Sequence, residues 1–149
     1  MAVQESTTNQ NFAFVLSGEA LSRSVTLLQD AGRGAAALVY GTLMAKVSAT
    51  GKWVPFTDET AVDGTATARG IFVGDDVTGA ALVAGDVTDV PIYVGGCFTF
   101  DAQQLVIENS KLLTTVVGGA TTENRTVQDD LESFGMYTEL TVDIDELEN

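Results

Sequence analysis

Histidine is absent from this chain of 149 residues, and cysteine occurs only once, as Cys97. Without histidine the chain lacks the commonest general base and the commonest metal ligand, which excludes Ser–His–Asp and Cys–His catalytic arrangements. A single cysteine also excludes an intrachain disulfide and a metal site built from several cysteines. Because Cys97 lies in an apolar stretch beside Phe98, we expect its thiol to be buried and unreactive.

Basic residues are scarce: seven Lys and Arg stand against 21 Asp and Glu, giving a net charge of −14. DNA, RNA and anionic membrane surfaces bind proteins through basic side chains, so we expect neither nucleic acid nor membrane as a partner. No run approaches the ~20 apolar residues that cross a bilayer. The opening residues MAVQESTTNQNF have no basic segment followed by an apolar one. We therefore expect no secretory signal, and synthesis in a cytoplasm.

Hydrophobic residues make up 45% of the chain, which suits one globular domain. Short apolar segments alternate with glycine-containing turns, and this pattern predicts a mainly β fold, a compact small β-sandwich or partly closed barrel. The expected strands are residues 38–48, 52–56, 68–73, 80–84, 90–94, 97–100 and 104–108, with Gly95-Gly96 as one of the turns.

The two ends of the chain differ from this central part. Residues 1–27 predict a flexible or extended N-terminal arm, polar at first and then alternating. One short C-terminal helix is expected over residues 124–134, because Val127, Leu131 and Phe134 share a helical stripe and Gly135 follows it. The segment after this helix alternates again and is expected to return as a strand. The domain then covers residues 28–142, and residues 143–149 form an acidic tail.

Carboxylates are the remaining candidates for chemistry. A pair of them can hydrolyse glycosides, and Asp75 or Asp129 would be the residues of such a hydrolase. With so many acids, neighbouring carboxylates are expected by chance in solvated turns. A calcium site at Asp143 and Asp145 would need more oxygen ligands than the tail supplies. The GRGAAA segment (residues 32–37) lacks the strand–helix context of a dinucleotide-binding loop. We expect no enzyme, no metal and no cofactor.

The stretch TLMAKVSATGKWVPF (residues 42–56) contains the only tryptophan. A three-residue loop over residues 49–51, with Gly51 in the left-handed conformation, would close a hairpin. That register places Val47 opposite Trp53, on one face with Pro55. Trp53 is then explained by packing in the core or at a contact between subunits.

Five short motifs occur in order along the chain. They are LSRSVTL (21–27), GTLMAKV (41–47), ATGKWVP (49–55), AVDG (61–64) and ARGI (68–71). The ordered set resembles the head decoration, or capsid-cementing, proteins of tailed bacteriophages, the lambda-like family. The similarity covers about residues 21–100 well and residues 124–142 more loosely.

The resemblance implies a β-tulip-like fold and a structural virion protein. Such a protein binds the outside of the expanded capsid as homotrimers at threefold and quasi-threefold positions, after synthesis in the host bacterial cytoplasm. Its partners are the major capsid protein and its own copies. The arm is expected to add extended chain to the capsid protein. The expected contacts in the arm are Phe12, Phe14, Leu16, Arg23 and Val25, and the hairpin residues expected to hold the fold or the trimer are Val47, Trp53 and Pro55.

A second interpretation stays open from the sequence. A β-rich module that binds carbohydrate or another small ligand could use Trp53 as a stacking platform. Burial of the Trp53 ring would argue against it.

Overall fold

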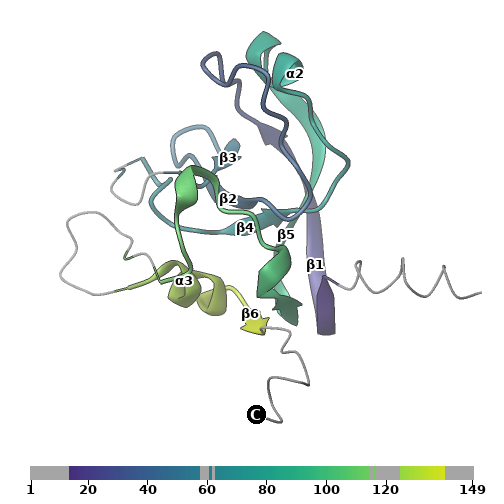
Figure 1. Cartoon of the computed structure of the whole chain (residues 1–149), viewed down its shortest axis with the longest axis vertical. Coiled ribbons are helices and arrows are strands. Elements are labelled where there is room, and N and C mark those ends of the chain that lie inside the picture. Colours follow the sequence, from purple (N-terminus) through teal and green to yellow (C-terminus); the bar gives the residue numbers. More distant parts are fainter. Residues whose placement is uncertain (1–13, 58–60, 62, 115, 117–124, 140–149) are drawn as a thin grey trace, which may run out of the picture.

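The computed structural model describes residues 14–57, 61, 63–114, 116 and 125–139. These residues form a mixed sheet of strands with two short helices and two 3₁₀ turns, so the prediction of a mainly β fold is confirmed (Figure 1). The elements are β1 (Val15–Leu27), β2 (Leu43–Lys46), β3 (Trp53–Pro55), β4 (Gly70–Phe72), α2 (Gly79–Ala84), β5 (Val87–Asp101), η1 (Ala102–Gln104), η2 (Glu108–Ser110), α3 (Val127–Ser133) and β6 (Met136–Glu139).

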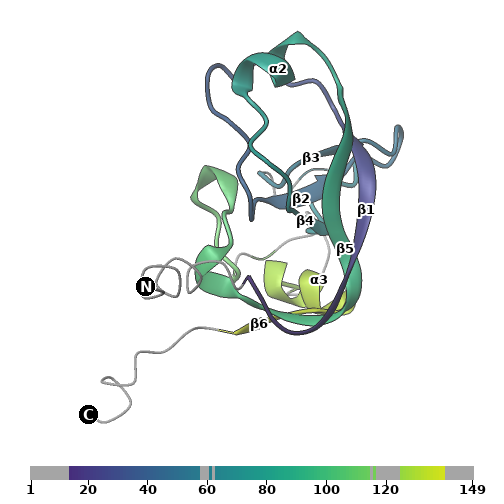
Figure 2. The same ribbon diagram turned by 90° about the vertical axis from the view of Figure 1, so that its right-hand side faces the viewer.

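Two long strands, β1 and β5, pair antiparallel along most of their length and form a curved ribbon on one side of the molecule (Figure 2). The sheet order is β1-β3-β2-β4-β5-β6, and the additional β1–β5 pairing brings the first five strands into a ring. At one point the ring depends on a single parallel pair, Leu27 with Trp53. Because this junction is so short, the sheet is ring-like and does not form a barrel.

The short strands β2, β3 and β4 separate two hydrophobic cores. Leu43, Ala45 and Ile71 point into one core, which α3 and β6 cover at one end of the molecule. Met44 and Phe72 alternate with them and point into the other core, next to α2. Residues on both faces of these strands are therefore buried, which explains why their sequences read as continuous apolar runs rather than as alternating ones.

Helix α3 forms where the sequence predicts a helix. Thr126 and Asp129 make a reciprocal capping box at its start, and the positive φ of Gly135 ends the following turn. Val127 and Leu131 are fully buried, as their helical spacing predicts. Strand β6 follows as expected up to Glu139, while the rest of the predicted strand lies outside the described residues.

Three predicted elements are wrong. Residues 80–84 belong to α2, because the Thr78 hydroxyl accepts a hydrogen bond from the Ala81 N–H and starts a helix there. The predicted turn at Gly95-Gly96 is absent, since β5 continues through both glycines. Residues 104–108 form no strand; η1 and η2 flank a single bridge between Thr42 and Val106.

The predicted register of the β2–β3 hairpin is also wrong by one residue. Lys46, not Val47, lies opposite Trp53. The Val47 N–H donates to the Lys52 carbonyl at 2.8 Å, so the loop has four residues, 48–51, instead of three. Gly51 does adopt the expected positive φ, and its N–H donates to the Val47 carbonyl. A shift of one residue changes which side chains share a face of the hairpin.

Candidate functional site

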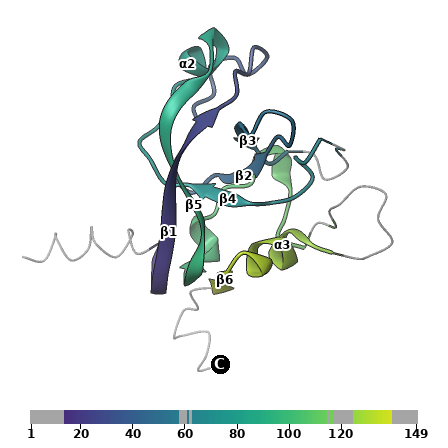
Figure 3. The ribbon, with the colours of Figure 1, turned by 180° about the vertical axis from the view of Figure 1, so that it is seen from behind.

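Strand β1 has a long edge without backbone partners among the described residues. Its inner edge pairs with β5 from Val15–Phe100 to Leu27–Val87. Its outer edge makes only the Leu27–Trp53 pair and the bond from the Leu28 N–H to the Trp53 carbonyl. In Figures 1 and 3, the N-terminal half of β1 stands at the margin of the ribbon with β5 on its inner side, whereas the arrowhead of β1 lies on the inner side of β5. An unpaired strand edge of this length, about 35 Å from Val15 to Val25, can accept an added strand from another protein.

Residues 16–19 and 21–24 of this strand are exposed. Leu16 and Leu21 are 38% and 48% exposed, and they are the two large apolar side chains among the exposed residues of this strand. Apolar side chains beside an open strand edge give an added strand something to pack against. Together they make this edge the candidate binding surface.

The structure separates the residues predicted for the arm. Phe12 lies outside the described residues. Phe14 is 1% exposed, stacked on Phe100 with ring centroids 5.2 Å apart, so its side chain belongs to the core. Leu16 and Arg23 are exposed, and Val25 is half-buried. Of the described arm residues, Leu16 and Arg23 are thus the most accessible to a partner.

Close backbone contacts shape the part of the ribbon near β6. Gly18 has a φ of +82°, and a Cβ there would lie 2.2 Å from the Cys97 carbonyl oxygen. Gly96 has a φ of +101°, and a Cβ there would lie 2.4 Å from the Glu19 oxygen. Only glycine fits such positions without moving the neighbouring strand. These glycines let β1 and β5 approach closely and bend together.

Cys97 pairs with Glu19 in this region and is exposed, so the prediction of a buried thiol is wrong. Side chains alternate across a strand, and the neighbouring Phe98 takes the buried face. The apolar character of the stretch comes from the residues on that buried face.

Of the three residues predicted for the hairpin, the structure buries one and half-buries the other two. Trp53 is 6% exposed and belongs to the core beside α2, whereas Val47 and Pro55 are half-buried. A Cβ built on Gly70 would lie 2.9 Å from the Trp53 ring, which shows how tightly the ring is packed. A stacking platform needs an exposed ring face. The burial of Trp53 therefore argues against the carbohydrate-binding interpretation.

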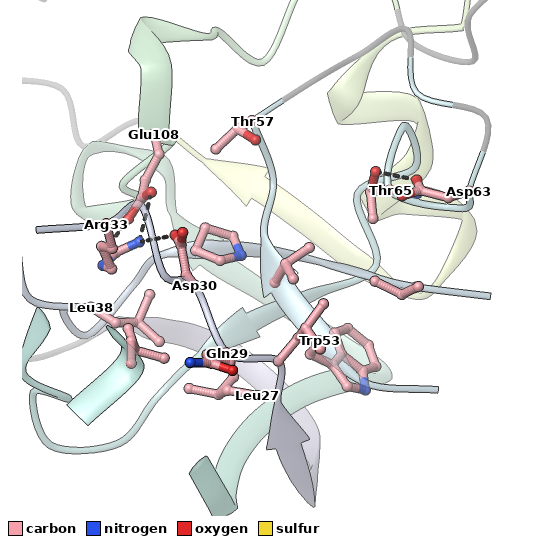
Figure 4. A pocket seen from close by; sticks show the side chains of 15 residues that line it. Leu27, Gln29, Asp30, Arg33, Leu38, Trp53, Thr57, Asp63, Thr65 and Glu108 are labelled. Carbon is pink, nitrogen blue, oxygen red and sulfur yellow. Dashed lines mark hydrogen bonds and ion pairs between the residues drawn. The ribbon is translucent and has the colours of Figure 1, made fainter. Parts of the chain in front are cut away.

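A hollow of about 300 Å³ lies beside Trp53, between the loop after β1 and η2 (Figure 4). Its main polar group is Arg33, whose side chain is 5% exposed. The guanidinium donates to both carboxylate oxygens of Glu108, at 3.2 and 2.6 Å, and to the carbonyls of Ala36 and Ala37. Asp30 adds a longer ion pair at 3.9 Å. Because Arg33 is already satisfied by these groups, it ties the loop to η2 and is not available to a ligand.

Asp129, which was considered for hydrolysis, and its neighbour Asp130 both accept hydrogen bonds from backbone N–H groups. The Asp129 carboxylate accepts a hydrogen bond from the Thr126 N–H in the helix cap. Asp130 is 2% exposed; it forms an ion pair with Arg125 and accepts from the Ala68 N–H at 3.0 Å. Burial raises the pKa of Asp130 even though these partners favour its charged form. Asp130 thus joins α3 to the segment before β4.

Asp75 lines an open hollow with Asp89 near the end of β4, where both side chains are exposed. Within the part of the chain that the structure describes, no group of three or more Cys, Asp or Glu residues could hold a metal ion. Across the same residues, neither helix has the length and apolar character needed to cross a bilayer.

Comparison of the sequence with models of protein families and with curated proteins finds no match to either.

The spacing of residues along the sequence does not reveal one feature of the surface. Strand β1, the β2–β3 hairpin and the segment before β4 bring three cations, Arg23, Lys46 and Arg69, to the rim of one hollow. Only Arg23 was a candidate from the sequence, because these residues are far apart along the chain.

Proposed function

We propose that this chain is a structural, non-enzymatic virion protein that binds the outside of the expanded head of a tailed bacteriophage and stabilises it. The observation that carries the proposal is the outer edge of β1, unpaired among the described residues over most of its length, with Leu16 and Leu21 exposed on it. The ordered motifs that resemble capsid-cementing proteins support the same function.

The proposed contact is strand addition. An extended segment of the major capsid protein pairs with the outer edge of β1, and backbone hydrogen bonds supply much of the affinity. Residues 1–13 directly precede the exposed N-terminal half of β1 and extend the contact. Leu16 then packs against the added strand, while Phe14 anchors this end of β1 to the core.

Stabilisation of the head follows from linkage. A protein that binds the expanded shell and not the immature shell shifts the equilibrium toward expansion. Binding as trimers at threefold and quasi-threefold positions multiplies a weak contact, because each further arm binds at a high effective concentration. The net charge of −14 suits a protein on the outside of the head, away from the packaged DNA.

Binding of the purified protein to expanded and immature heads of the phage that encodes it tests the proposal. We expect binding to expanded heads only, and a loss of at least about tenfold in affinity for Leu16→Asp. Leu112→Asp is the matched control, because Leu112 is 65% exposed and lies outside β1.

A second variant lacking residues 2–12 keeps Phe14 and the whole of β1, and should also bind more weakly. Equal binding to both kinds of head would overturn the cementing function. Unchanged binding of both Leu16→Asp and the truncated variant would overturn the role of the arm.

A further inference from the structure

Four of the seven basic residues of this acidic chain line one groove. The groove consists of two adjoining hollows of about 320 and 420 Å³, which share Arg23, Lys46 and Trp53. Arg69 lines the smaller hollow and Lys52 the larger. We call this surface the basic groove. In a chain of net charge −14, such a concentration of cations is a local reversal of the overall charge.

Most of these cations have no acidic partner among the described residues. Lys52 pairs with Asp86, but Arg23 and Lys46 form no ion pair there. Arg69 lies over the Phe134 ring, with its guanidinium carbon 5.1 Å from the ring centroid. The only acidic residue that lines either hollow is Asp89, in the larger one, where Ser24 donates to it at 3.5 Å.

The groove also adjoins the free edge of β1. Arg23 and Leu21 belong to that strand, and Leu21 and Val94 add apolar surface to the smaller hollow. An extended segment along this edge would therefore meet backbone partners, apolar surface and unpaired cations together. A segment that alternates apolar and acidic residues satisfies all three.

Residues 140–149, LTVDIDELEN, have this character. Leu140, Val142 and Ile144 alternate with Thr141, Asp143 and Asp145, and the segment holds four acids and no base. We infer that the basic groove binds residues 140–149 of a second copy of this chain.

The course of β6 favours a second copy over the same chain. Strand β6 runs parallel to the last part of β5 and ends with Glu139 beside Asp101. The basic groove lies at the level of Val94, seven residues back along β5, about 23 Å away. The chain therefore leaves β6 pointing away from its own groove, and its own segment would have to reverse direction to reach it.

This inference concerns the contact between copies and does not depend on the capsid. It assigns Leu21 and Arg23 to that contact and leaves the N-terminal half of β1, where Leu16 lies, to the proposed capsid partner. Sedimentation velocity of the purified full-length chain tests it, and head binding remains a separate measurement.

Two reversed variants make the test specific. Arg23→Glu with Lys46→Glu reverses the charge of the groove, and Asp143→Lys with Asp145→Lys reverses the charge of the segment. We expect the wild type to self-associate as concentration rises, and each double variant to associate at least about tenfold more weakly. An equimolar mixture of the two should associate again, because each then offers the other a complementary contact. Lys111→Glu, outside the groove, should behave as the wild type.

Trp53 fluorescence in each variant shows that the fold is intact, since this tryptophan is buried beside the groove. A wild type that stays monomeric at every concentration would overturn the inference. Double variants that self-associate as strongly as the wild type would also overturn it, and this is the result expected if the segment binds its own chain. An equimolar mixture of the two double variants that fails to associate would overturn it as well.

Discussion

Phe14 provides the sharpest test of how β1 is built, because the sequence predicts a capsid contact there and the structure buries the side chain. Phe14 stacks on Phe100 and meets the Tyr40 ring edge-on with centroids 5.7 Å apart. Phe14→Ala would remove a ring that is 1% exposed and leave a cavity between these neighbours. Substitutions of this kind lower the free energy of unfolding by about 3–5 kcal/mol.

Urea unfolding followed by Trp53 fluorescence measures this loss. With an m-value of about 2 kcal/mol/M, the midpoint should fall by roughly 1.5–2.5 M. Leu16→Ala is the control, because Leu16 is 38% exposed and its truncation should cost less than about 1 kcal/mol. Equal midpoints for Phe14→Ala and the wild type would refute the core assignment and return Phe14 to the list of partner contacts.

Three further predictions concern single sites. Gly96→Ala should cost about 1–3 kcal/mol, because its Cβ would meet a backbone oxygen of β1 at 2.4 Å; thermal unfolding should show Gly85→Ala, which has open space around it, to be far milder. Burial raises the pKa of Asp130, so the folded state binds a proton there at a higher pH than the unfolded chain. As the pH falls from about 7 to about 4, the free energy of unfolding of the wild type should therefore rise relative to that of Asp130→Asn. A decrease over the same pH range would contradict the assignment. The hydrogen bond from Lys52 lowers the pKa of Asp86; in Lys52→Met that pKa, followed by NMR, should move upward, and an unmoved titration would count against the pair.

Local signals in the sequence predict local structure well. Helix α3 follows from the spacing of Val127 and Leu131 and from Gly135, all within one short segment. The predicted strand over residues 80–84 is wrong because it depends on a short apolar run, which fits a buried helix as well as a strand. The hydrogen bond that the Thr78 side chain accepts at the start of α2 stabilises the helix.

Features that depend on distant residues could not be predicted. Gly95-Gly96 reads as a turn, yet Gly96 serves the close approach of β1, some 75 residues earlier in the chain. The basic groove likewise depends on the pairing of β3 with both β1 and β2, which brings Arg23 and Lys46 to the same hollow beside Trp53. The candidate edge was foreseen only in part: the extended segment was expected, but its pairing to β5 and the burial of Phe14 were not.

The length of the β1–β5 ladder has a mechanical consequence. A pull on the chain before Val15, directed along β1 while the body is held at the α2 end, loads the whole row of pairs from Val15–Phe100 to Leu27–Val87 in shear. Those bonds must then yield together. A pull across the strand opens the same bonds one after another, starting at the Val15 end. An anchor made through this end of the molecule is therefore strongest against lengthwise tension and weakest against peeling.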